Sequence, residues 1–155
     1  MSSVIRGDDN FDSTPTVSSN VPAFSAKPSS NQDIPDNTYT KLLFGTEIVD
    51  TNSKFTDSKF TPTVSGLYFL STTVLFSDGV GSAFIRARLM KNGSELLVNV
   101  DQYDSNSGTG AINLSALVEA NTTDYFEIFV RQTRGQPTFV QAAQTRFSGF
   151  KLAGV

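Results

Sequence analysis

Short apolar segments separated by turn signals run through most of the chain, and none shows sustained helical periodicity. Several of them alternate apolar and polar residues with a period of two, as a half-buried strand does. One example places Ile112, Leu114 and Val118 on a single face. The dipeptide Asn92-Gly93 separates two further segments and favours a tight hairpin, because it tolerates positive φ at both central positions. Closely spaced strands of this kind predict an all-β antiparallel sandwich or barrel.

Two more segments follow the same alternation. In residues 83–89 the apolar positions share one face and leave Arg86 and Arg88 on the other. Residues 125–130 also alternate, with Phe126, Ile128 and Val130 on one face and Tyr125, Glu127 and Phe129 on the other. Because the turn signal at 121–123 lies directly between two strands, we expect the strands on either side of it to form a hairpin.

One long segment, 66–76, is apolar on both faces. A sandwich strand needs only one apolar face, so its second face must be covered by a loop or by another subunit. We assign the face of Phe69 to the core and the face of Tyr68 to a subunit interface. Near the end of the chain, Phe147 and Phe150 are an odd number of positions apart, so their side chains are expected on opposite faces of a strand. The residues expected at the interface are Tyr68, Leu70, Val74, Phe76, Tyr125, Phe129 and Phe150.

The composition excludes several kinds of chemistry. The 155 residues contain no Cys and no His, which rules out disulfides, thiolate ligands, Ser-His-Asp triads and histidine-bearing zinc sites. Charged residues make up 17%, the net charge is −3, and no block of Lys or Arg is present, so we expect no nucleic-acid partner. No apolar run reaches the ~20 residues needed to span a bilayer, so no membrane partner is expected. We therefore expect a non-enzymatic protein.

Residues 1–21 are polar, rich in Ser and Thr and aperiodic. No apolar stretch follows Met1, so we expect no export signal and synthesis in a cytoplasm. The interpretation that remains is an extended attachment arm, in which Val4, Ile5 and Phe11 are the anchoring residues. The folded domain is then expected over residues 22–155.

Calcium is the one cofactor that the sequence leaves open. Asp101 and Asp104 lie in a polar segment that we expect to be a loop, where carboxylates could bind the ion. A solvated loop without metal is the alternative. The N-terminal acidic segment begins like an EF-hand loop, but Ser13 and Ser19 stand where that loop needs Gly and Glu. No other cofactor is expected.

Four stretches occur in an order that is similar to a known family. They are PAFSA at 22–26, FTPTVSGLYFLSTTV at 60–74, LMKNG at 89–93 and TRFSGFKLAGV at 145–155. Together they resemble the globular head domain of the complement C1q family, in the tumour-necrosis-factor-like superfamily. The resemblance implies a ten-stranded antiparallel jelly roll that assembles as a tight homotrimer, and some relatives bind calcium near the trimer apex. The chain departs from the family pattern in having no cysteine and in having Thr123-Asp124 where Gly-Asp is usual.

A head domain behind a short arm resembles the C1q-type modules of tailed-bacteriophage structural proteins. The first hypothesis is a trimeric virion protein, either a capsid decoration protein or a knob, anchored to other virion proteins by its arm. The alternative is a tail-fibre or receptor-binding tip that recognises a host glycan or protein through its apical loops. The arm spans at most ~70 Å when fully extended and contains no heptads, which favours the structural role. Both hypotheses place the protein in the virion.

Overall fold

A computed structural model describes residues 22–77, 83–103 and 109–152. This part of the chain forms thirteen β-strands and no helix. The strands are β1 (Ala23–Lys27), β2 (Gln32–Ile34), β3 (Thr40–Lys41), β4 (Thr46–Asp50), β5 (Phe55–Thr56), β6 (Lys59–Phe60), β7 (Gly66–Ser77), β8 (Ala83–Lys91), β9 (Ser94–Tyr103), β10 (Thr109–Ala120), β11 (Phe126–Gln132), β12 (Thr138–Val140) and β13 (Arg146–Lys151). The expected all-β fold is confirmed, with more strands than the expected ten because several are short pieces of two or three residues.

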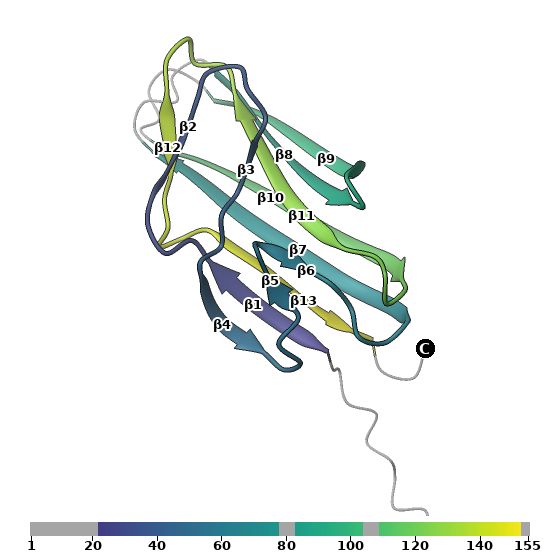
Figure 1. Ribbon diagram of the computed structural model, residues 1–155. Helices are drawn as coiled ribbons and strands as arrows, with labels where there is room; N and C mark the ends of the chain where they lie inside the picture. Colours follow the sequence, from purple (N-terminus) through teal and green to yellow (C-terminus); the bar gives the residue numbers. More distant parts are fainter. Residues whose placement is uncertain (1–21, 78–82, 104–108, 153–155) are drawn as a thin grey trace, which may run out of the picture.

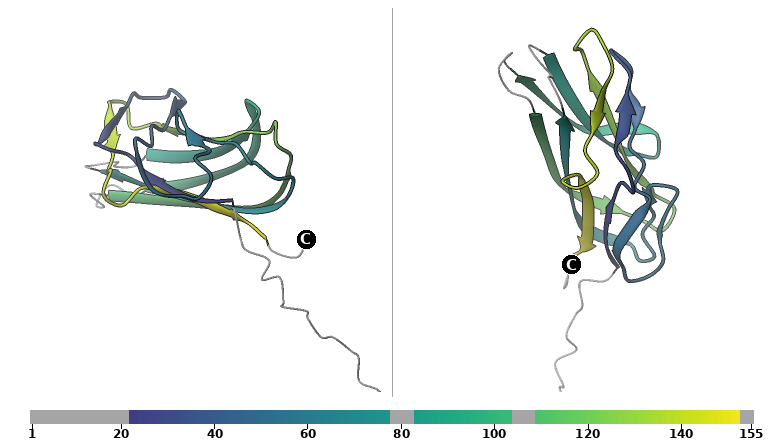
Figure 2. Two further views of the ribbon diagram at one scale, coloured as in Figure 1. Left: turned by 60° about the horizontal axis from the view of Figure 1, so that its bottom comes forward. Right: turned by 90° about the vertical axis from the view of Figure 1, so that its left-hand side faces the viewer.

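The strands form two antiparallel sheets that pack face to face (Figures 1 and 2). The seven-stranded sheet has the order β2-β12-β7-β13-β1-β4, and β10 pairs with the other edge of β7. The six-stranded sheet has the order β5-β6-β11-β8-β9, and β3 pairs with β11. Between β7 and β11 the chain changes sheet three times, which is the connectivity of a jelly roll.

Strand β7 is the centre of the seven-stranded sheet, and its two faces are the reverse of what the sequence analysis expected. Tyr68, Leu70, Val74 and Phe76 are fully buried in the core of a single subunit, so they cannot contact a second subunit. Phe69 is only partly buried and lies on the outer face. The predicted alternation is confirmed. Because both faces of the strand are apolar, however, alternation alone does not determine which face packs against the other sheet.

The turns were predicted with mixed success. The hairpin at Asn92-Gly93 is confirmed: it joins β8 to β9, and φ is 54° at Asn92 and 77° at Gly93. The hairpin expected at 121–123 is wrong, because β10 pairs with β7 in one sheet while β11 pairs with β8 in the other. This turn carries the chain across the sandwich. A turn signal shows that a strand ends there, but it does not specify the partner of the next strand.

Aromatic side chains from both sheets fill one end of the core. The ring of Phe24 on β1 stacks on Phe60 with centroids 4.2 Å apart and on Phe55 with centroids 5.1 Å apart. Phe147 on β13 meets Phe24 edge-on at 4.9 Å. Burying aromatic rings of this size supplies a large share of core stability, and the stacked and edge-on geometries add to it. The interlocked rings therefore hold the two sheets in one fixed arrangement.

The described chain begins and ends at the same end of the sandwich. The backbone N–H of Lys151 donates to the carbonyl oxygen of Pro22 at 3.0 Å, which places the start of β1 beside the end of β13 (Figure 1). The expected arm, with Val4, Ile5 and Phe11, lies outside the described residues.

Candidate functional site

The outer face of the seven-stranded sheet carries a continuous line of apolar side chains across four strands. In register, Leu117 of β10 lies opposite Phe69 of β7, Phe69 lies opposite Phe150 of β13, and Phe150 lies opposite Ala23 of β1. We call these four residues the apolar row. Leu117 is 61% exposed and Phe150 is 37% exposed, and the rings of Phe69 and Phe150 contact each other with centroids 5.7 Å apart.

Beside the apolar row lies a second line made only of serine. Ser115, Ser71, Ser148 and Ser25 occupy consecutive strands in register, and we call them the serine row. The hydroxyl of Ser148 donates to that of Ser25 at 2.8 Å, which satisfies polar groups within the row. Serine side chains are short and project little above the backbone of the sheet. Another protein could therefore approach this backbone closely.

At the end of the serine row, β4 forms the edge of the sheet. Its Ile48 and Val49 are 53% and 45% exposed, and Val49 lies opposite Ser25. Exposed apolar residues scattered singly over a surface are normal, whereas a contiguous apolar patch marks an interaction surface. The apolar row and this edge together make the outer face of the seven-stranded sheet the candidate functional site.

The expected interface residues are distributed over three places. Four of them are in the core, as described above. Phe129 lies on the outer face of the six-stranded sheet and Tyr125 directly precedes β11, and both are partly buried. Phe150 alone lies on the outer face of the seven-stranded sheet. The fold therefore separates residues that strand alternation groups together, because alternation does not assign a strand to its sheet.

The most exposed residue of the apolar row, Leu117, was missed. The segment that contains it is polar at Asn113, Ser115 and Glu119 on the same face, so the alternation gives no reason to expect an interface residue at Leu117. A single leucine that interrupts a polar face was the available signal. The serine row carried no such signal, because its four members become neighbours only through the register of four strands.

A buried carboxylate organises the end of the sandwich where β10 crosses to β11. Asp124 accepts hydrogen bonds from the backbone N–H of Asn121 at 2.8 Å and from the side-chain amide of Asn92 at 2.7 Å. The ammonium of Lys91 lies 3.0 Å away. The hydrogen bond from Asn121, followed by that from Asn92, lowers the pKa of Asp124 below its ordinary value. Asp124 thus holds the β8–β9 hairpin against the crossover.

An open groove of about 530 Å³ adjoins this carboxylate and is lined by Leu67, Lys91 and Glu119, among others. Lys91 is satisfied by Asp124 and by the carbonyl oxygen of Glu119 at 2.8 Å. Lys91 and Asp124 are therefore engaged with each other and with the backbone, and they serve the crossover.

The structure places one of the two residues expected to bind calcium. Asp101 lies in strand β9, opposite Ile85 of β8, and not in the expected loop. Asp104 lies outside the described residues. In the part of the chain that the structure describes, no three acidic side chains gather closely enough to hold a metal ion. The same residues include no helix that could cross a membrane.

Comparison with known proteins decides the family. The profile of the C1q domain matches residues 23–152. The chain belongs to the C1q domain family. C1q-type and related domains commonly form trimers and are generally non-enzymatic structural or ligand-binding modules. No curated protein matches the sequence.

Solved structures of C1q-like and related proteins share this fold. The globular domain of zebrafish complement 1qA aligns with a TM-score of 0.63 at 18% identity, covering 84% of this chain and 96% of that domain. Murine APRIL at pH 5.0 aligns with a TM-score of 0.63 at 12% identity, covering 84% of this chain and 98% of that one. Its structure at pH 8.5 gives 0.61, also at 12% identity. At these identities the similarity shows the fold of this C1q domain alone.

Proposed function

We propose that this C1q domain is a non-enzymatic homotrimeric structural protein of a tailed-bacteriophage virion. Its subunits associate through the outer face of the seven-stranded sheet. The observation that carries the assembly is the apolar row, which leaves Leu117, Phe69 and Phe150 in contact with solvent in a single subunit. Covering a large apolar side chain contributes roughly 1.5–3 kcal/mol, so a few such residues per interface favour association strongly.

A threefold arrangement suits this surface for a geometric reason. In a closed ring each subunit presents one patch to the next subunit and receives a different patch from the previous one. The face of the sheet and its β4 edge, with exposed Ile48 and Val49, are two such patches on one sheet. The serine row, which runs beside the apolar row and ends at β4, has short side chains that allow the neighbouring subunit to come close.

The virion role rests on the resemblance of the sequence to phage structural modules. Residues 1–21 serve in this proposal as the attachment arm, with Val4, Ile5 and Phe11 in apolar pockets of another virion protein. The described chain begins beside its own C-terminal strand, so the three arms of a trimer would leave from one end. A decoration or knob protein needs this geometry, since one end attaches and the rest faces outward.

Particles assembled with a chain lacking residues 2–20 test the proposal. We expect the truncated chain to fold and to form trimers, because the arm precedes the sandwich, and to be missing from purified particles. Full-length chain should appear on the particle surface in groups of three by electron microscopy. Truncated chain at normal occupancy on particles would contradict the attachment role, and full-length chain absent from particles would contradict the virion role.

A further inference from the structure

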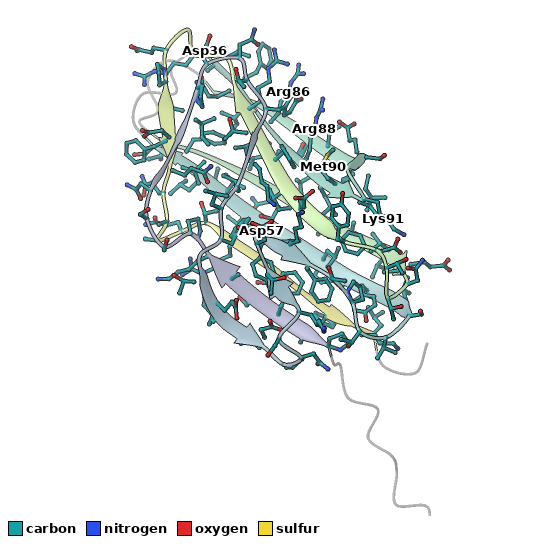
Figure 3. The ribbon with its side chains drawn as sticks, viewed as in Figure 1. Asp36, Asp57, Arg86, Arg88, Met90 and Lys91 are labelled. Atoms are coloured by element: carbon teal, nitrogen blue, oxygen red, sulfur yellow. The ribbon has the colours of Figure 1, made fainter. Side chains whose placement is uncertain are left out.

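Three arginines cluster on the outer face of the six-stranded sheet. Arg86 and Arg88 project from β8 (Figure 3), and Arg131 of β11 lies directly opposite Arg86. Like charges in directly opposed positions destabilise a sheet. One carboxylate among the described residues pairs with this arginine cluster: Glu95 lies 2.7 Å from Nε of Arg88. Within the described chain, the positive charges of Arg86 and Arg131 have no acidic partner.

The ring of Tyr39 holds two of the three guanidinium groups in place. The guanidinium carbon of Arg88 lies 3.6 Å from the ring centroid and that of Arg131 lies 5.4 Å from it. Arg131 also donates to the side-chain oxygen of Asn37. These contacts fix the positions of long side chains that would otherwise lose conformational freedom on binding a ligand. The arginine cluster is therefore preorganised.

Several polar atoms of the arginine cluster have no hydrogen-bond partner in the described part of the chain. They are the hydroxyl of Tyr39 and Nε of Arg86, Arg88 and Arg131, and all four are shielded from solvent. Nε of Arg88 has the ion-pair contact with Glu95 but not the geometry of a hydrogen bond. Shielded donors without partners are costly and uncommon in native proteins. An anion at the outer ends of the guanidinium groups would neutralise positive charge that the protein leaves poorly compensated, and it would offset the repulsion between Arg86 and Arg131.

The surroundings of the arginine cluster favour one class of anion. Phe84, 44% exposed, precedes Arg86 by two residues and lies on the same face of β8. A guanidinium group can bind a carboxylate through two parallel hydrogen bonds, in bidentate geometry. An exposed aromatic ring can pack against the apolar face of a sugar. We propose that the arginine cluster binds the carboxylate of an acidic saccharide, with a sugar ring packed on Phe84.

Other polyanions fit this surface less well. Bound peptides use sheet edges or grooves, where backbone groups or pockets receive them, whereas this site is the flat face of a sheet. Nucleic acids are held by many phosphate contacts, and the chain has a net charge of −3 with no extended basic stripe.

The site is complete within one subunit and lies on the sheet opposite the proposed assembly surface. It therefore does not depend on the proposed trimer or on the virion role. A monomeric variant of the chain should bind the saccharide as the wild type does, so failure of one proposal is distinguishable from failure of the other.

Calorimetric titration of the full chain with tetragalacturonic acid tests the proposal. We expect binding that weakens about tenfold in Arg86→Gln and in Arg131→Gln, because each removes a charge-assisted contact. Lys54→Gln is the matched control: it makes the same change in net charge at an exposed position directly before β5 and should leave the affinity unchanged. Phe84→Ala should also weaken binding.

Two further ligands distinguish binding of an acidic saccharide from binding of any sugar or any polyanion. The fully methyl-esterified tetrasaccharide should bind at least tenfold more weakly, because it lacks the carboxylates. Tetraglutamate should also bind at least tenfold more weakly, because it offers no sugar ring to Phe84. The proposal is overturned if tetragalacturonic acid does not bind, if Arg86→Gln and Lys54→Gln bind alike, or if tetraglutamate binds equally well.

Discussion

The outer faces of the two sheets cover the same core, yet among the described residues only the face of the six-stranded sheet carries a cluster of arginines. The outer face of the seven-stranded sheet carries the large apolar side chains of Leu117, Phe69 and Phe150. Beside them runs a row of short serine side chains. The face of the six-stranded sheet carries the arginine cluster around Tyr39. A core needs only the inner faces, so this difference reflects what each outer face meets. The first is suited to another protein surface, and the second to a charged ligand.

The largest expected effect tests whether the apolar row belongs to the subunit's own fold. Tyr68 and Phe69 are adjacent on β7 but face opposite ways. We expect Tyr68→Ala to lower the free energy of unfolding of the subunit by about 3–5 kcal/mol, because it empties a fully buried site. Phe69→Ala should cost the isolated subunit much less and should mainly weaken association. Urea unfolding together with sedimentation separates the two effects, and equal losses of subunit stability would break the comparison.

A somewhat smaller effect tests the register that aligns the rows. Gly149 lies between Leu70 and Phe24 on the core side, and a Cβ there would meet Leu70 Cδ2 at 2.5 Å and the carbonyl oxygen of Phe69 at 2.9 Å. Gly149→Val should therefore destabilise the subunit by about 2–3 kcal/mol. Ser148→Val on the outer face is the control and should cost less. Equal thermal shifts for the two variants would contradict the register.

The network around Asp124 gives a pH-dependent effect at the end where the two sheets are tied together. Hydrogen bonds lower the pKa of Asp124 in the folded state, so its contribution to stability is fully present above the ordinary carboxyl pKa of about 3.9. The contribution is lost as the pH falls through the lower, folded-state value. We expect Asp124→Asn to destabilise the protein by about 1–3 kcal/mol at neutral pH and by less in acid. Asp33→Asn, at an exposed position, is the control and should change the free energy of unfolding little. A difference in unfolding free energy between Asp124→Asn and wild type that stays constant across pH 2–7 would argue against this account.

The smallest effect concerns the arginine cluster. Because Arg131 faces Arg86 directly, Arg131→Gln removes a repulsion along with a partly exposed side chain. We expect the free energy of unfolding to change by no more than about 0.5 kcal/mol, in either direction. Chemical denaturation in low salt, where repulsion between exposed charges is strongest, is the suitable measurement. A loss of 2 kcal/mol or more would show that the arginines stabilise the fold, which would weaken the case for a ligand site.

Much of the fold was accessible from sequence because strand alternation is a local property. The inward positions of β8, such as Ile85 and Leu89, and the hairpin at Asn92-Gly93 follow from two or three neighbouring residues. The opposite directions of Phe147 and Phe150 were also correct, since one is fully buried and the other 37% exposed. The all-β class required nothing beyond such patterns.

The site required information that no local pattern contains. Tyr68 and Phe69 offer similar apolar bulk, and only the position of the opposite sheet, whose Phe60 ring lies 5.7 Å from that of Tyr68, determines which one is buried. The serine row and the stacking of Arg88 on Tyr39 join residues that are far apart in the chain. Strand pairing creates these neighbours, and a single sequence does not specify it.

The central claim is that the apolar row, and not the opposite outer face, joins three subunits. Sedimentation equilibrium at micromolar concentration tests it with two matched variants: Leu117→Asp on the apolar row and Val98→Asp, 39% exposed, on the outer face of the six-stranded sheet. Wild type and Val98→Asp should both sediment at three times the chain mass, whereas Leu117→Asp should sediment as a folded monomer. A wild-type monomer, or a Leu117→Asp variant that remains trimeric while Val98→Asp dissociates, would contradict the account.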